Sequence, residues 1–311
     1  MKSRYILLLI GMNLLWAASY PIFKYLTDSI SSGALSTLRF GICAILLTLA
    51  WPWLGRQNPR WSDLPRLAAL GVIVFCAAPR LQIEGVHLGQ AGDTSLLMAL
   101  DPLITAIAAA VFLREKVPVR RWWGCALGMI GVVLLSRVWT GEAVPMRGLA
   151  ANVLFILSFF CEAAYSVLGK PILHRCSPMK ILGVGAVFGT VANLALDLTF
   201  DHGSTWRALT ILTPTGWVLV LYLAIVCTVV GYTLWYLVIR ETEVNVTGLT
   251  VLAQPLAGLL LAVVWLGERV HAGQLWGSLA IIAGLVVGLR RTSPAAGDLV
   301  TTAPGAREPI A

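Results

Sequence analysis

Apolar residues occur along this chain in long runs that short polar segments separate. Each run approaches the roughly 20 residues that an α-helix needs to cross the hydrocarbon core of a membrane. Ten such runs are predicted: 4–27, 33–54, 66–86, 92–113, 120–138, 148–169, 179–200, 214–238, 245–267 and 273–290. They take up most of the chain, so the pattern predicts an all-α integral membrane protein with ten transmembrane helices.

The composition agrees with this pattern. Of the 311 residues, 58% are hydrophobic and 12% are charged, and the mean hydropathy is +0.81. Soluble domains use about 25% charged residues, so this chain has too few charges to cover a water-exposed surface. The six cysteines form none of the close pairs that metal and redox motifs require. We therefore expect neither a metal nor a cofactor.

The net charge of +8 is better explained by membrane topology than by nucleic-acid binding. Lys and Arg concentrate in the cytoplasmic loops of membrane proteins, and with the N-terminus inside most of the 23 basic residues fall in cytoplasmic segments. We expect a multi-pass protein of the inner or plasma membrane with both termini in the cytoplasm. The tail 292–311, rich in Pro, Ala, Gly and Thr, is predicted to be disordered.

The two halves of the chain share a pattern of polar residues and prolines at equal spacing. In the first half, Asp101 is followed by a proline and precedes Glu115. In the second half, Gln254 is followed by a proline and precedes Glu268 at the same spacing. Each half contains five apolar runs, and because five is odd the second half enters the membrane with the opposite polarity. The pattern predicts an inverted repeat, which is typical of secondary transporters.

Several short motifs resemble the EamA-type members of the drug/metabolite transporter superfamily. They are Trp-Ala-Ala-Ser-Tyr-Pro-Ile-Phe-Lys at 16–24, Leu-Arg-Phe at 38–40, and the two Pro-to-Glu copies. The resemblance implies two five-helix repeats, 4–138 and 148–291, around a central cavity lined mainly by spans one, three, four, six, eight and nine. It also implies export of metabolites or drugs. Two departures concern polar chemistry: Glu162 stands where the second half would repeat Trp16, and the second half has no match to Arg39.

Six ionisable side chains fall within or at the ends of the apolar runs: Lys24, Arg39, Arg80, Glu84, Asp101 and Glu162. Because such a group costs at least about 2.5 to 3.5 kcal/mol at the bilayer centre, it usually faces a cavity or a partner. Arg80 and Glu84 share one helical face, where they either pair structurally or contact the substrate. Asp101 precedes a helix-breaking proline; it and Glu162 either serve the fold or bind an ammonium group and carry protons.

Aromatic residues at helical spacing can wall a cavity and stack on ligands. Trp16 and Tyr20 share a face of the first span, and Trp235 lies in the eighth. The candidate substrate-binding residues are therefore Trp16, Tyr20, Arg39, Arg80, Glu84, Asp101, Glu162, Tyr165, Trp235 and Gln254. The candidates for proton coupling are Asp101, Glu162 and Glu84.

Function classes other than transport lack their motifs. The chain has no Walker-type phosphate loop, no H-E-x-x-H and no G-x-S-x-G, so an ATPase or a hydrolase is not expected. The hypothesis is a secondary exporter of amino acids or amino-acid-like metabolites, working by alternating access with proton coupling. A multidrug or cationic-compound exporter and a lipid head-group flippase are the alternatives. The expected partners are a small-molecule substrate and the lipid bilayer, and the spacings Gly124/Gly128 and Gly284/Gly288 permit a homodimer.

Overall fold

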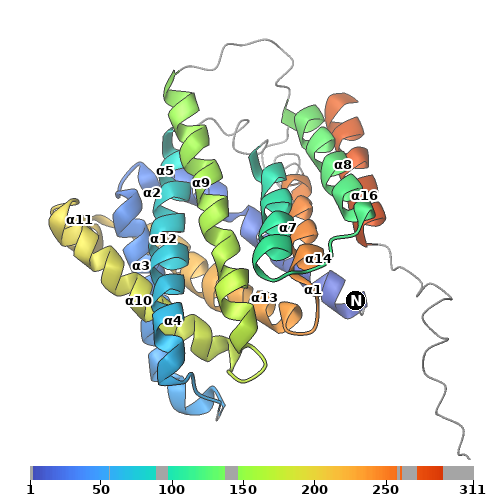
Figure 1. Cartoon of the computed structure of the whole chain (residues 1–311). Coiled ribbons are helices and arrows are strands. Elements are labelled where there is room, and N and C mark those ends of the chain that lie inside the picture. The colour runs from blue at the N-terminus through green and yellow to red at the C-terminus, as the bar shows by residue number, and fades with distance from the viewer. Residues whose placement is uncertain are drawn as a thin grey trace, which may run out of the picture.

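The computed structural model describes residues 3–55, 57–88, 97–136, 146–257, 260 and 272–289. Within these ranges the regular secondary structure is helical and contains no strand (Figure 1), which confirms the all-α class. Six helical segments are long and apolar enough to cross a membrane: Tyr5–Thr27, Ser32–Leu49, Trp61–Leu88, Ala150–Ile172, Pro178–Thr199 and Pro214–Ile239. They coincide with predicted runs one, two, three, six, seven and eight. The other four runs each extend beyond the described residues, so the count of ten stays a prediction.

In its described residues, the first half of the chain is a succession of helices. Its elements are α1 (Ser3–Ala17), α2 (Ser19–Thr27), α3 (Ser32–Leu49), η1 (Trp51–Trp53), η2 (Trp61–Asp63), α4 (Leu64–Val72), η3 (Ile73–Ala77), α5 (Ala78–Leu88), η4 (Met98–Leu100), α7 (Asp101–Phe112) and α8 (Val119–Ser136). The first span is interrupted at Ala18, directly after Ala17, whose carbonyl receives no helical hydrogen bond from Pro21 because proline has no N–H. Ser31 is the N-cap of α3, because its hydroxyl accepts a hydrogen bond from the backbone N–H of Ala34 at 3.1 Å.

The second half is also built from helices. Its elements are α9 (Met146–Gly169), η6 (Lys170–Ile172), α10 (Pro178–Thr199), α11 (Ser204–Ile211), α12 (Pro214–Leu221), η7 (Tyr222–Val230), α13 (Gly231–Ile239), α14 (Val244–Leu249), η8 (Thr250–Leu252) and α16 (Ala272–Leu289). The short helix α11 lies in the connection between two spans, where the hydropathy pattern predicts no element. Thr213 caps α12 through a 3.1 Å hydrogen bond from Gly216 N, and the following proline suits the first helical turn.

Helices of the two halves pack on each other throughout the molecule. The cross-half packing pairs are α8 with α16, α5 with α9, α3 with α10, α7 with α14 and α1 with α13. In Figure 1, α8 and α16 run side by side at one edge of the molecule. The core between the halves is apolar, with Phe40 and Phe75 in one buried cluster and Phe23, Phe155 and Phe159 in another. The halves therefore form one joint interior.

Glycine makes the α8–α16 contact close. A Cβ atom built on Gly124 would lie 2.9 Å from the carbonyl oxygen of Gly284, and one on Gly284 would lie 2.7 Å from that of Gly124. No side chain larger than hydrogen fits at that separation. The small-residue spacing noted in the sequence therefore serves helix packing within one chain.

Spans three and eight each contain a π-helix, η3 and η7. A π-turn shifts the hydrogen-bond ladder by one residue and leaves backbone groups for other partners. At the end of η7, the N–H of Gly231 donates to the carbonyls of Val226 and Thr228. The Cys227 carbonyl, which an α-helix would join to that N–H, instead accepts a hydrogen bond from Trp16 Nε1 at 2.7 Å. The irregular backbone thus orients a side chain of the first span.

Candidate functional site

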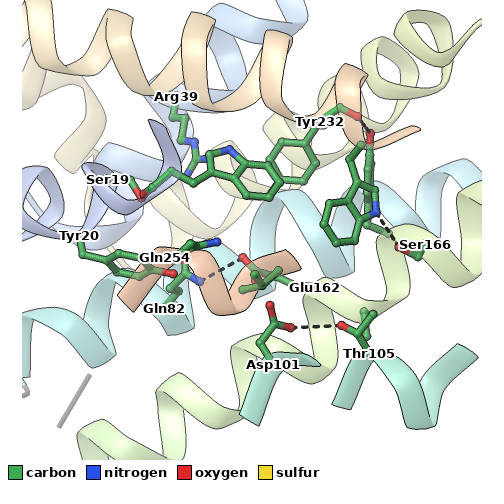
Figure 2. A pocket seen from close by; sticks show the side chains of 15 residues that line it. Ser19, Tyr20, Arg39, Gln82, Asp101, Thr105, Glu162, Ser166, Tyr232 and Gln254 are labelled. Atoms are coloured by element: carbon green, nitrogen blue, oxygen red, sulfur yellow. Dashed lines mark hydrogen bonds between the residues drawn. The ribbon is translucent and has the colours of Figure 1, made fainter. Parts of the chain in front are cut away.

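A cavity lies among the spans of both halves, and its walls are polar on some sides and aromatic on others (Figure 2). Its lining residues are Trp16, Ser19, Tyr20, Arg39, Gln82, Asp101, Thr105, Glu162, Ala163, Tyr165, Ser166, Tyr232, Trp235, Val251 and Gln254. The space not filled by protein atoms is about 690 Å³, the part open to solvent included. Spans one, three, four, six, eight and nine contribute as the resemblance implies, and span two adds Arg39.

Arg39 supplies the positive charge of the cavity. Its side chain is 5% exposed, and its Nε donates a hydrogen bond to Thr228 Oγ1 at 2.7 Å. The guanidinium carbon lies 5.1 Å from the ring centroid of Phe40 and 5.7 Å from that of Phe23, which places the cation against two aromatic rings. Among the described residues no carboxylate lies within 4.0 Å of Arg39.

Asp101 and Glu162 supply two carboxylates to the same cavity (Figure 2). Asp101 Oδ1 accepts a hydrogen bond from Thr105 at 3.2 Å, and Glu162 Oε1 accepts one from Gln82 Nε2 at 3.1 Å. Neither acid forms an ion pair within the described part of the chain. The cavity therefore presents one cation and two acidic groups whose charges are not neutralised by direct contact with one another.

Aromatic rings form another wall. The ring centroid of Trp16 lies 5.6 Å from that of Tyr232 and 6.0 Å from that of Trp235. Trp235 Nε1 donates to Ser166 Oγ at 2.9 Å, and the ring of Tyr165 lies 4.8 Å from that of Tyr232. Because Trp16 Nε1, Trp235 Nε1 and the Tyr165 hydroxyl are bonded within the protein, these three rings offer apolar surface and π faces to a ligand.

The side-chain oxygen of Gln254 has no hydrogen-bond partner among the described residues. Its Nε2 donates to Asn13 Oδ1 at 2.8 Å, whereas its Oε1 is buried and accepts no hydrogen bond from any described residue. Asn13 is held in turn by bonds to the Leu9 carbonyl and to Thr250 Oγ1. An unpaired buried acceptor is costly, and because this oxygen is closed off from solvent, a ligand in the cavity does not reach it in this conformation.

Arg80 and Glu84 do not line this cavity. Arg80 NH1 forms an ion pair with Asp201 at 2.8 Å, and its Nε donates to Asn193 Oδ1 at 2.8 Å. The Asn193 amide in turn donates to the carbonyl of Phe75, which Pro79 leaves without its helical donor. Arg80 thus ties α5 to α10, and its ion-pair partner is Asp201 and not Glu84.

A second polar cluster joins the two halves away from the cavity. Glu115 Oε1 lies 2.6 Å from Lys170 Nζ, and Glu115 accepts further hydrogen bonds from the backbone N–H groups of Val244 and Asn245. Burial of the Glu115 carboxyl raises its pKa, but the hydrogen bonds and the charge of Lys170 outweigh this effect, so the pKa lies below its usual range. At neutral pH the Glu115 carboxyl is therefore ionised.

Nothing in the described residues points to a metal centre, because no group of three or more His, Cys, Asp or Glu side chains converges there. The lining residues that the sequence interpretation left out of its candidates include Ser19, Gln82, Thr105, Ser166 and Tyr232. Gln82 has a visible signal in the sequence, because it is a polar amide within an apolar run. Arg80 and Glu84, two residues away on either side, are charged and give a stronger signal. The hydroxyl groups carry no comparable signal, since Ser and Thr occur widely in membrane helices.

Apolar spanning helices around an internal cavity with uncompensated charges define a membrane transport protein. The chain belongs to the EamA-like transporter family, whose model matches residues 3–137 and 149–290. This confirms the resemblance seen in the short motifs. Membership of a membrane transporter family implies a small-molecule substrate and a lipid bilayer around the protein.

Named relatives cover nearly the whole chain. A probable terminal-alkyne amino-acid exporter of Streptantibioticus cattleyicolor is 29% identical over 279 residues, which are 89% of this chain and 90% of the relative. A probable amino-acid metabolite efflux pump of Escherichia coli is 26% identical over 285 residues, 88% of this chain and 92% of the relative. One crystal structure matches with a TM-score of 0.71 at 19% identity, covering 93% of this chain and 99% of the other. That likeness concerns the fold alone.

Proposed function

We propose that this protein is a secondary transporter of the cell membrane that exports small amphipathic metabolites, amino acids or amino-acid-like compounds, by alternating access. The observation that carries the proposal is the cavity, in which Arg39, Asp101 and Glu162 share one space with no ion pair among them. An internal salt bridge would cancel such charges. A bound molecule with both charge signs would complement them instead.

The proposal includes ten spans arranged as two inverted repeats. The helix pairs support it, because spans two and seven, four and nine, and five and ten pair with their own repeat mates. Span three packs on span six, and span one packs on span eight, which is the same contact with the halves exchanged. A two-fold relation between the halves gives this pattern. The π-helices in spans three and eight fit the same relation.

Export from the cytoplasm is favoured by the names of the relatives, which are described as an amino-acid exporter and an amino-acid metabolite efflux pump. The concentration of Lys and Arg in alternate loops supports cytoplasmic termini and a place in the inner or plasma membrane. At identities below 30% the substrates of these relatives are not assigned to this protein. The substrate class is therefore proposed from the chemistry of the cavity.

A multidrug or cationic-compound exporter is the second candidate. Two acids and an aromatic wall suit an organic cation, and Trp16 and Trp235, whose ring centroids lie 6.0 Å apart, form one aromatic surface for such a ligand. Arg39 argues against it, because a buried guanidinium in the same cavity repels a ligand that carries positive charge alone. Transport of cations with exclusion of zwitterions would decide for this alternative.

The test is an efflux and counterflow screen of the purified protein in proteoliposomes. The panel contains amino acids, organic acids, nucleobases, cationic dyes and a head-group-labelled lipid, with protein-free vesicles as the control. We expect saturable flux of one or more amino acids. Movement of the labelled lipid with no flux of any solute would show a flippase and overturn the proposal.

A further inference from the structure

The orientation of Arg39 and its surroundings assign it a specific partner. Its Nε is taken up by Thr228, but within the described chain no acceptor bonds to either terminal nitrogen. Those two nitrogens are also absent from the buried, unpartnered atoms of the described residues, so they have access to the cavity that Arg39 lines. The exposed edge of a guanidinium matches the two oxygens of a carboxylate.

Thr228 fixes the direction of that edge. It lies in the π-helix η7, where its hydroxyl donates to the carbonyl of Leu223 at 2.8 Å, a residue five positions earlier. Because the proton is committed to Leu223, the oxygen lone pairs are free to accept from Arg39 Nε at 2.7 Å. Thr228 is fully buried. The π-turn therefore creates an acceptor that leaves both terminal nitrogens of Arg39 for a ligand.

We propose that Arg39 binds the carboxylate of the transported molecule and that Thr228 is the positioning residue that holds Arg39 for this contact. The inference rests on the proposed function, since it assumes that the cavity is the substrate site. The ammonium group then lies toward Asp101 and Glu162, which line the same cavity. The side chain of the ligand lies against the aromatic wall.

Three probes that share one ring separate the contributions of the two charged groups. L-Phenylalanine carries both charges, phenethylamine lacks the carboxylate and 3-phenylpropanoate lacks the ammonium group. Dissociation constants are measured by calorimetry on the full-length protein in detergent, so that membrane permeation of the probes does not matter. Arg39→Gln is expected to weaken binding of the two carboxylates by about 10- to 100-fold and to leave phenethylamine as tight or tighter.

Thr228→Val should weaken binding of the same two probes several-fold, because it removes the acceptor that holds the Arg39 guanidinium. The maximal counterflow rate of L-phenylalanine should stay within a factor of about two. Thr228→Ser restores the acceptor and should restore affinity. Arg121→Gln is the matched control, because Arg121 is a buried arginine paired with Glu243 outside the cavity. It should lower the affinity of none of the three probes.

The outcomes separate two kinds of failure. If the wild-type protein binds phenylalanine, and Arg39→Gln weakens all three probes equally or none of them, the carboxylate role is wrong while the transporter proposal stands. If Thr228→Ser behaves like Thr228→Val, the positioning role is wrong. If the wild-type protein neither binds L-phenylalanine nor moves any amino acid in the vesicle screen, the proposed function fails and the inference fails with it.

Discussion

Lys170 Nζ lies 2.6 Å from Glu115 Oε1, and this ion pair ties the connection after α7 to η6, which follows α9 directly. The Glu115 side chain is 8% exposed and that of Lys170 is 25% exposed. Lys170 also donates to the carbonyl of Thr242 at 2.7 Å. The cluster therefore joins segments of both halves at one end of the spans, which the proposed topology places on the cytoplasmic side.

Glu115→Gln is expected to destabilise the protein by about 1–3 kcal/mol at neutral pH, because it removes an ionised acceptor from a partly buried cluster. The folded-state pKa of Glu115 is below its usual value, so its contribution is present above the unfolded pKa of about 4.3 and is lost as the pH falls through the folded value. Thermal unfolding in detergent between pH 7 and pH 3.5 should show a steeper loss for the wild type than for the variant.

Lys116→Gln is the control for this measurement, since Lys116 is an exposed residue of the same connection. Its unfolding curve should follow that of the wild type at every pH. Equal slopes for the wild type and Glu115→Gln below pH 5 would contradict an ionised role for Glu115.

Proton coupling predicts a specific behaviour of the acids in the cavity. Asp101→Asn and Glu162→Gln should each reduce uptake driven by an imposed pH gradient by at least roughly tenfold, a change that corresponds to 1.4 kcal/mol. Exchange without a gradient should persist at saturating substrate, because the conformational change does not require a net proton movement, although each variant should bind the ammonium group more weakly. The measurement is flux of the substrate found in the vesicle screen, with and without the gradient.

Glu84→Gln is the matched acid-to-amide control, because Glu84 lies in α5 but is not among the residues lining the cavity. It should respond to the pH gradient as the wild type does. Flux that is independent of pH in the wild type would remove the coupling hypothesis and leave transport intact.

Charged residues within apolar runs were the most informative part of the sequence. Their high cost in the membrane marked Arg39, Asp101 and Glu162, and all three line one cavity. The same rule also marked Arg80, whose partner Asp201 lies on the other half of the chain. Hydropathy cannot distinguish these two cases, because an ion pair and a cavity both relieve the cost of a buried charge.

Contacts between helices could not be predicted from the sequence, for a different reason. The periodicity of one helix says which residues share its face, but not which helix packs against it. The bond from Gln82 to Glu162 and that from Trp16 to the Cys227 carbonyl both depend on the tertiary arrangement. The second also needs a π-turn, and no local residue pattern in 222–230 announces one.

Gly231 makes room for Trp16. A Cβ atom on Gly231 would lie 2.6 Å from the indole Nε1 and 2.9 Å from Cε2, so Gly231→Ala forces the rigid ring away from the Cys227 carbonyl. We expect a loss of about 1–3 kcal/mol in stability from overpacking and a several-fold change in substrate affinity. Trp16→Phe relieves the clash, so the double variant should recover stability relative to Gly231→Ala. Unfolding temperatures and binding of the same probe check both effects, and a double variant less stable than Gly231→Ala would contradict the assigned clash.

The α8–α16 contact offers a test of helix packing that is independent of transport. A Cβ on Gly284 would lie 2.7 Å from the Gly124 carbonyl oxygen and 3.0 Å from the Gly128 nitrogen, and backbone atoms cannot move aside as side chains do. Gly284→Ala should therefore cost about 1–3 kcal/mol from overpacking, partly offset by about 1 kcal/mol of helix propensity. Gly11→Ala gains the same propensity with no atom within 4 Å of its Cβ, so it should be neutral or stabilising. Unfolding temperatures of the two variants in one detergent compare the sites directly, and a Gly284→Ala protein as stable as Gly11→Ala would rule out the close approach of these helices.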